Sequence, residues 1–136
     1  MDSILWNLYT YASIGLVGLI WTIQMVHYPS FRFVDEKQWE RFHGYHTFSI
    51  SIIVMPPMLV EMVLSLYFAF FHPGWITYTC LAIVIAIWIN TFFQAVPLHN
   101  KLQKKMDFAI IKKLVQVNWI RTFLWSIKAV LVLIAF

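Results

Sequence analysis

Four apolar segments, each about as long as a membrane is thick, constrain this chain more than any other feature. A helix needs about 20 residues to cross a hydrocarbon core. Segments of that length cover approximately residues 5–28, 47–71, 75–97 and 115–136. We therefore expect an all-α fold, a four-transmembrane-helix bundle, with residues 1–136 forming a single transmembrane domain.

The composition agrees with a lipid bilayer as the surroundings. Of the 136 residues, 61% are hydrophobic and 12% are charged. A soluble domain is typically about 45–50% apolar and about 25% charged. A soluble fold of this chain would expose larger apolar patches than soluble monomers carry. The chain also has no nucleic-acid-binding motif, so we expect no nucleic acid among its partners.

Positive charge is concentrated in the first and third connections between the apolar segments. These two connections hold eight of the ten Lys and Arg residues: Arg32, Lys37, Arg41, Lys101, Lys104, Lys105, Lys112 and Lys113. Short loops rich in Lys and Arg stay in the cytoplasm. We therefore expect cytoplasmic loops, both termini outside and a bacterial inner-membrane location. Asp35, with Gln38 three residues later, and Asp107 are predicted helix N-caps in these loops.

A weak internal repeat relates the two halves of the chain. Residues 22–26 resemble residues 92–96, and residues 46–52 resemble residues 121–127. The repeat predicts two pseudo-repeated helical hairpins, related by a rough two-fold axis along the membrane normal. Chance similarity between short apolar stretches is the alternative.

Polar residues are expected to converge at the cytoplasmic end of the bundle. The first and third helices end there, and the second and fourth begin there. The residues placed at similar depth are Gln24, His27, His43, His46, Gln94, His99, Asn100, Asn118 and Arg121. Since polar groups of membrane helices normally face the bundle interior, these side chains predict a buried site.

The histidines of this predicted site suggest two kinds of chemistry. His27, His43, His46 and His99 could bind iron, copper, zinc or haem through imidazole nitrogens. His46 and His99 could instead act as catalytic bases. The alternative to both is that the histidines cap helix ends or bind lipid headgroups.

The amides and the arginine suggest ligand binding. Arg121 and Asn118, three residues apart on one helix face, suit an anionic or carbonyl-bearing ligand or a developing oxyanion. A lipid phosphate bound by Arg121 is the alternative. Gln24 and Gln94, with Lys128, are candidate cofactor-binding residues.

Two charged residues are expected deeper in the bilayer. Glu61 follows Pro56-Pro57, a pair that predicts a helix kink, and Lys128 lies inside the fourth helix. An ionisable group at such depth costs about 3 kcal/mol or more, so both residues are candidates for a functional role. Glu61 would handle protons or anchor the bundle.

The expected depths of Glu61 and Lys128 in the bilayer predict that these two residues do not pair directly. A rise of about 1.5 Å per residue puts Glu61 about 22 Å beyond His46 and Lys128 about 10 Å beyond Arg121. If His46 and Arg121 lie at equal depth, a gap of about 12 Å remains. The partners that we expect for Glu61 are therefore tyrosines: Tyr9, Tyr11 or Tyr78.

Part of the C-terminal half resembles the anthrone-oxygenase-like four-helix membrane proteins. The stretches that carry the resemblance are Val96-Pro97-Leu98-His99-Asn100-Lys101-Leu102 and Asn118-Trp119-Ile120-Arg121-Thr122. His99 stands where that pattern usually has asparagine. The resemblance implies that the protein oxidises a lipophilic aromatic molecule without a recognisable cofactor motif. The residues that it implies are functional are His99, Asn118 and Arg121.

Over its whole length the chain resembles small bacterial four-helix integral membrane proteins. The motifs are Tyr28-Pro29, Tyr45-His46, Pro56–Glu61 and Asn118–Thr122. We expect an oxidoreductase or oxygenase that acts on a lipophilic substrate. The alternative is a non-enzymatic protein: a small transporter, a metal or haem carrier, or an assembly partner. Either could act alone or as a homodimer.

Overall fold

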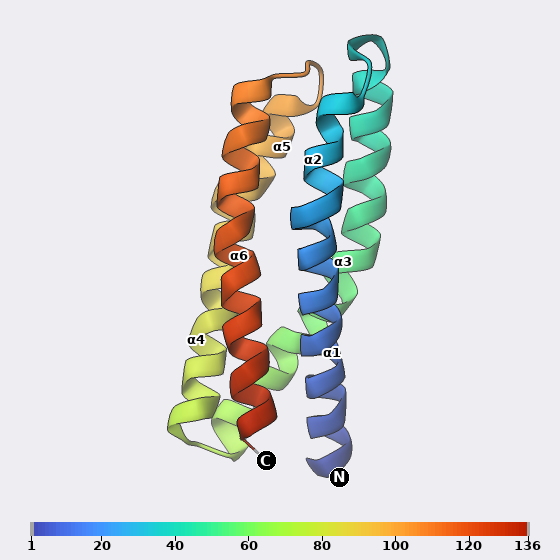
Figure 1. Ribbon diagram of the computed structural model, residues 1–136. Helices are drawn as coiled ribbons and strands as arrows, with labels where there is room; N and C mark the ends of the chain where they lie inside the picture. Colours follow the sequence, from blue (N-terminus) through green and yellow to red (C-terminus); the bar gives the residue numbers. More distant parts are fainter. Residues whose placement is uncertain (1, 136) are drawn as a thin grey trace.

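The computed structural model describes residues 2–135, and these residues form a bundle of four long helical rods (Figure 1). Within residues 2–135 there is no strand, so the predicted all-α fold is confirmed. Each rod is long and apolar enough to cross a membrane. In chain order, the helices of the rods are α1 (Asp2–Thr22), η1 (Ile23–His27) and α2 (Tyr28–Ser30); α3 (Trp39–Phe71); α4 (Trp75–Asn90), η4 (Thr91–Ala95) and α5 (Val96–Leu102); and α6 (Phe108–Ile134).

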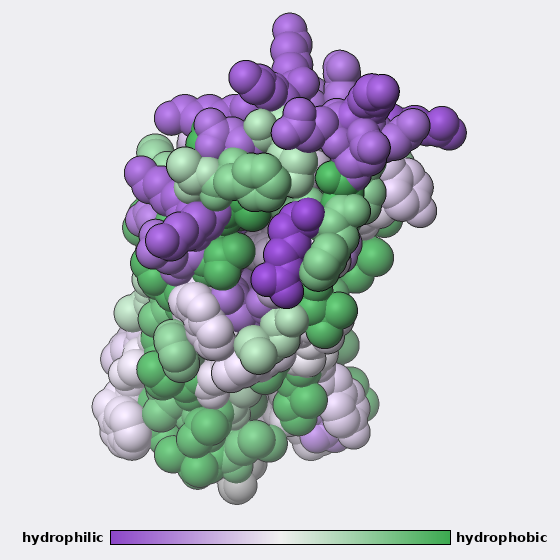
Figure 2. All heavy atoms as spheres, turned by 45° about the horizontal axis from the view of Figure 1, so that its top comes forward, coloured by the Kyte–Doolittle hydropathy of each residue, from purple (hydrophilic) through white to green (hydrophobic). Residues whose placement is uncertain are grey.

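The two ends of the bundle differ in character. The connection with the short helices η2 (Phe31–Phe33) and η3 (Glu36–Gln38) lies at the same end as the connection between α5 and α6 (Figure 1). Figure 2 shows hydrophilic side chains gathered at this end, which we call the charged end. The two termini and the turn between α3 and α4 lie at the other end, the terminal end (Figure 1).

At the charged end, an aspartate caps the start of the helix that follows each of the two connections, as the sequence predicts. Asp35 Oδ1 accepts a hydrogen bond from the Lys37 backbone N–H at 2.8 Å, just before η3 and α3. Asp107 Oδ1 accepts from Ala109 N–H at 2.9 Å and from Ile110 N–H at 3.1 Å. These caps let α3 and α6 begin at Trp39 and Phe108, several residues before the predicted membrane spans.

A π-helical segment interrupts the first rod and the third rod at corresponding places. The N–H of Tyr28 bonds to the carbonyl of Ile23, and the N–H of Val96 bonds to the carbonyl of Thr91, in each case five residues back. A proline is the second residue after each segment, at Pro29 and Pro97. The proline ring clashes with the carbonyl four residues back, and the wider π turn relieves this clash. Both segments therefore have a sequence cause.

The four rods pack in a ring that opens toward the charged end. α6 packs against α1 and α4, and α3 packs against the same two helices. α3 carries Pro56 and Pro57 inside it, and it bends behind α1 to reach the side of α4 (Figure 1). Nearer the charged end, the backbone of α3 comes close to η4 and α5 at few points, and side chains span the distance, such as Trp39, whose indole N–H donates to the Leu102 carbonyl at 2.7 Å. We call this wider junction the seam between α3 and η4/α5.

Candidate functional site

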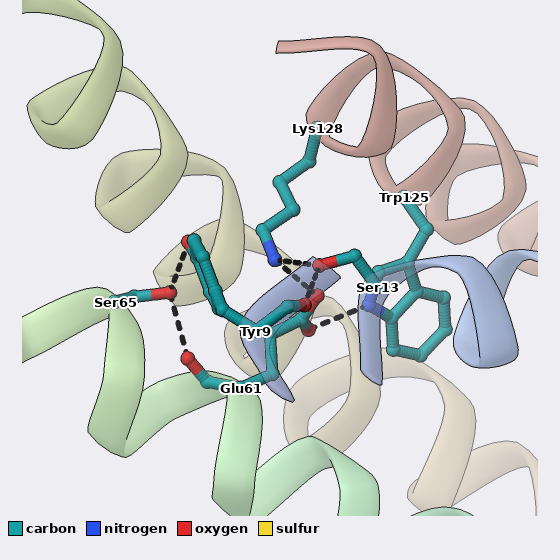
Figure 3. Close-up of polar contacts among 6 residues, drawn as sticks. All are labelled: Tyr9, Ser13, Glu61, Ser65, Trp125 and Lys128. Atoms are coloured by element: carbon teal, nitrogen blue, oxygen red, sulfur yellow. Dashed lines mark hydrogen bonds and ion pairs between the residues drawn. The ribbon is translucent and has the colours of Figure 1, made fainter. Parts of the chain in front are cut away.

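A buried ion pair lies in the core of the bundle, in the half nearer the terminal end. Lys128 Nζ of α6 is 2.7 Å from Glu61 Oε1 of α3, and the two side chains are 0% and 1% exposed. The second carboxylate oxygen accepts a hydrogen bond of 2.8 Å from the Trp125 indole N–H. The carboxylate thus lies between an ammonium group and an indole, both from α6 (Figure 3).

Hydroxyl groups complete this deep cluster and bring α1 into it. Lys128 donates to Ser13 Oγ at 2.5 Å, and its Nζ lies 3.7 Å from the centre of the Tyr9 ring. The Tyr9 and Ser65 hydroxyl oxygens are 2.8 Å apart, and Ser65 donates to the backbone carbonyl of Glu61 at 2.7 Å. The cluster therefore joins α1, α3 and α6 (Figure 3).

The direct bond between Glu61 and Lys128 corrects the prediction from depth. That prediction counted a full helical rise per residue along the membrane normal. α3 carries Pro56 and Pro57 and runs obliquely behind α1 (Figure 1), so its residues advance less along the bundle than the count assumes. Of the tyrosines expected beside Glu61, only Tyr9 belongs to the cluster. Tyr11 and Tyr78 are exposed.

Four histidines from three rods meet nearer the charged end. His27 Nε2 lies 2.6 Å from His46 Nδ1, and His43 Nε2 lies 3.2 Å from His99 Nδ1. The two pairs are neighbours, since the His46 and His99 ring centres are 5.5 Å apart. The expected meeting of the histidines is therefore found, as two hydrogen-bonded pairs.

The geometry of these pairs differs from that of a metal centre. Within residues 2–135, no group of three or more His, Cys, Asp or Glu side chains is arranged to hold a metal ion. The imidazoles bond to one another instead of facing a common point. Two buried nitrogens, His43 Nδ1 and His46 Nε2, are left without a hydrogen-bond partner.

A chain of amide and guanidinium groups runs beside the histidines. Gln24 accepts a hydrogen bond from the Asn118 amide at 2.7 Å, and Asn118 Oδ1 accepts one from Arg121 Nη2 at 2.5 Å. The same Nη2 reaches the Tyr28 hydroxyl at 3.5 Å. That hydroxyl lies 3.2 Å from His99 Nε2. Gln24, Asn118, Arg121 and His99 are thus brought together as predicted, with Tyr28 as the link.

Three predicted members of the site are placed differently from the prediction. Gln94 and Asn100 are exposed, so the expectation that they face the bundle interior is wrong, although Asn100 lines a cavity that His99 also lines. Gln94 is the fourth residue of its π segment, whereas Gln24 is the second residue of the other, so the two glutamines face different ways. Lys128 belongs to the deep cluster and not to the site of Gln24.

The polar groups line one end of an apolar cavity. This cavity, of about 200 Å³, has Tyr28, His99 and Arg121 in its wall, together with Trp125 of the deep cluster. The rest of the wall is almost entirely apolar and comes from the first three rods: Leu16, Leu19, Ile20, Ile23, Ile50, Ser51, Val54, Met55, Met58, Thr91, Phe92, Ala95 and Val96. We call this the seam cavity.

The seam cavity faces the lipid side of the bundle. Its wall includes Ser51 of α3, which is exposed, and Phe92 and Val96, which are 44% and 38% exposed. These three residues lie on the two sides of the seam between α3 and η4/α5. A lipophilic molecule could therefore reach the cavity directly from the hydrocarbon region.

A second cavity continues the seam toward the charged end. It measures about 190 Å³ and is lined partly by polar side chains, among them His43, Thr47 and Gln103. His99 lines both cavities. This residue therefore stands between an apolar compartment and a more polar one.

The spacing of several of these side chains in the sequence indicates that they are neighbours. Arg121, Trp125 and Lys128 lie on one face of α6, at four and then three residues apart, as that spacing predicts. Ser65 lies one turn after Glu61, and its hydroxyl bonds back to the carbonyl of that residue. The spacing suggests such neighbours, but the role of Tyr28 depends on the π segment before it.

Comparison of the chain with protein-family models, with curated proteins and with solved structures finds no match. Any function therefore has to be argued from the geometry of the site.

Proposed function

We propose that this protein is a membrane enzyme that removes a proton from a lipophilic carbonyl compound, as the first step of its oxidation. The observation that carries the proposal is the composition of the seam cavity wall. A base (His99), a hydroxyl (Tyr28) and a guanidinium (Arg121) line one end of a cavity that is otherwise apolar. Binding sites of small lipophilic molecules typically combine apolar walls with a few convergent polar groups.

The positions of these groups suit the formation of an oxyanion. The Tyr28 hydroxyl lies 3.2 Å from His99 Nε2 and 3.5 Å from Arg121 Nη2, so one oxygen already lies between the base and the cation. A substrate carbonyl oxygen bound near this point would be held by Tyr28 and Arg121. Donors fixed around a developing negative charge are usually the largest source of catalysis.

The proposed step balances as a proton transfer. His99 takes a proton from a CH₂ group that is conjugated with the carbonyl through an aromatic ring, as in anthrone, and the electron pair of that C–H bond moves through the ring to form an enolate at the oxygen. Dioxygen then serves as the oxidant, because a CH₂ group and O₂ together yield a carbonyl group and water. The resemblance to anthrone-oxygenase-like proteins supports this choice of reaction.

Access and orientation follow from the same arrangement. The substrate enters from lipid through the seam, with its oxygen toward the charged end. The proposal puts this end in the cytoplasm of a bacterial inner membrane, because lysine and arginine are concentrated there. The polar cavity on the other side of His99 gives the proton a route toward water.

Hydrogen–deuterium exchange of anthrone tests the proton transfer separately from oxidation. Purified protein in lipid nanodiscs is incubated with anthrone in deuterated buffer without oxygen, and label at the CH₂ carbon is measured by mass spectrometry. We expect exchange at least about tenfold faster than in empty nanodiscs, since general base catalysis typically contributes more than this. The variant His72→Gln, changed in the turn at the terminal end, should exchange at the wild-type rate. Binding of anthrone without faster exchange would instead indicate a carrier.

A further inference from the structure

The two buried cations of α6 have unequal surroundings. Lys128 is paired with the Glu61 carboxylate at 2.7 Å. Arg121 is 7% exposed, but its hydrogen-bond acceptors are the neutral Asn118 amide and the neutral Tyr28 hydroxyl. Among the described residues no carboxylate pairs with Arg121. Its positive charge is therefore not balanced within this part of the chain.

The Arg121 guanidinium also has an unused donor. Its Nε is buried and has no hydrogen-bond partner. An unmade hydrogen bond of a buried polar group is unfavourable, and more so for a charged group. Since Arg121 lines the seam cavity, a molecule in that cavity can supply both the missing acceptor and the missing negative charge.

We infer that the seam cavity binds a lipophilic acid as its anion, with a single carboxylate or phenolate head at Arg121 and an apolar body against α1, α3 and η4. The inference rests on the proposed function, because an enolate formed there is an anion of the same class. Guanidinium is well matched to such heads, since its fixed fork of donors fits carboxylate geometry. The apolar walls, including Leu16, Val54 and Met58, match the body.

A pair of ligands of matched shape tests the charge preference. The probes are 9-anthracenecarboxylate and the neutral 9-anthracenemethanol, and binding to the protein in phosphatidylcholine nanodiscs is followed by anthracene fluorescence. After correction for partition into empty nanodiscs, we expect the carboxylate to bind about tenfold tighter, as one charge-assisted hydrogen bond provides. Equal affinity, or tighter binding of the alcohol, would overturn the inference.

Variants assign the preference to Arg121. Arg121→Gln should remove the preference for the carboxylate, and Arg121→Lys should keep part of it. Lys101→Gln, which removes an exposed cation at the same end, should leave it unchanged. If Arg121→Gln does not fold, two measurements still test the inference. They are the ratio of carboxylate to alcohol affinity in the wild type, and the comparison of that ratio between Arg121→Lys and Lys101→Gln. A preference lost equally in Lys101→Gln would contradict a role for Arg121.

The source of the anionic head is resolved by adding phosphatidylglycerol to the nanodiscs. Competition with the anthracene carboxylate in the wild type but not in Arg121→Gln would identify a lipid phosphate as the head. An unchanged carboxylate affinity would identify a free lipophilic acid. The first result would overturn the inference of a carboxylate or phenolate head, and the second supports it. The binding assay is independent of anthrone exchange, so a charge preference without exchange would refute the proposed function and leave the inference standing.

Discussion

Replacing Glu61 with glutamine is expected to destabilise the folded bundle by about 3–5 kcal/mol, which is typical when one partner of a buried ion pair is removed. The change leaves Lys128, which is 0% exposed, without its counter-charge. It also replaces the carboxylate oxygen that accepts the Trp125 indole N–H. Since the cluster joins α1, α3 and α6, the loss should affect the whole bundle rather than one helix.

Unfolding titrations in mixed detergent micelles measure this effect. Glu40→Gln is the matched control, because it makes the same change on the exposed part of α3 and should alter stability by no more than about 0.5 kcal/mol. The double variant Glu61→Gln with Lys128→Met should recover much of the lost stability, because it leaves no unpaired buried charge. If Glu61→Gln matched Glu40→Gln, the ion pair would have no role in stability.

Replacing His99 with glutamine is expected to lower the rate of anthrone exchange by about 10²–10⁴-fold, the usual contribution of a positioned general base. Glutamine keeps a polar side chain of similar length but cannot accept the proton at neutral pH. Tyr28→Phe should have an effect at the lower end of this range, about 10²-fold, because Arg121 still holds the oxygen. Exchange rates in nanodiscs under anaerobic conditions measure both variants.

His46→Gln is the matched control for this prediction. His46 lies in the same histidine cluster, with its ring centre 5.5 Å from that of His99. It is absent, however, from the walls of the seam cavity and of the second, more polar cavity. We therefore expect a much smaller loss of exchange than in His99→Gln. Equal losses in the two variants would mean that the cluster acts only through the shape of the site, and the assignment of His99 as the base would be wrong.

The sequence predicted the number of helices and the pairing of their ends well because these depend on few variables. Apolar length sets the number of spans, and paired short loops place helix ends at common depths. The convergence of Gln24, Asn118 and Arg121 with the histidines follows from that topology alone. The aspartate caps at Asp35 and Asp107 depend on local hydrogen bonding, which is also readable from sequence.

The failures have a common physical origin in irregular helix geometry. Gln94 was predicted to face inward, but its place in a π segment turns it outward. The bond between Glu61 and Lys128 was missed because helix bending changes depth per residue. The seam cavity depends on how far α3 diverges from α5, a tertiary feature with no local sequence signal.

The central claim is that a lipophilic carbonyl compound enters the bundle through the seam and occupies the cavity beside His99 and Arg121. Photolabelling with benzophenone in nanodiscs tests it most directly, because this ketone is lipophilic and has no proton that the site could remove. After illumination, peptide mass spectrometry locates the labelled residues. We expect label within residues 50–58 and 91–96, and less of it when 9-anthracenecarboxylate is present. Label spread evenly over exposed lipid-facing residues outside these ranges, such as Phe70 and Phe123, without competition, would contradict the account.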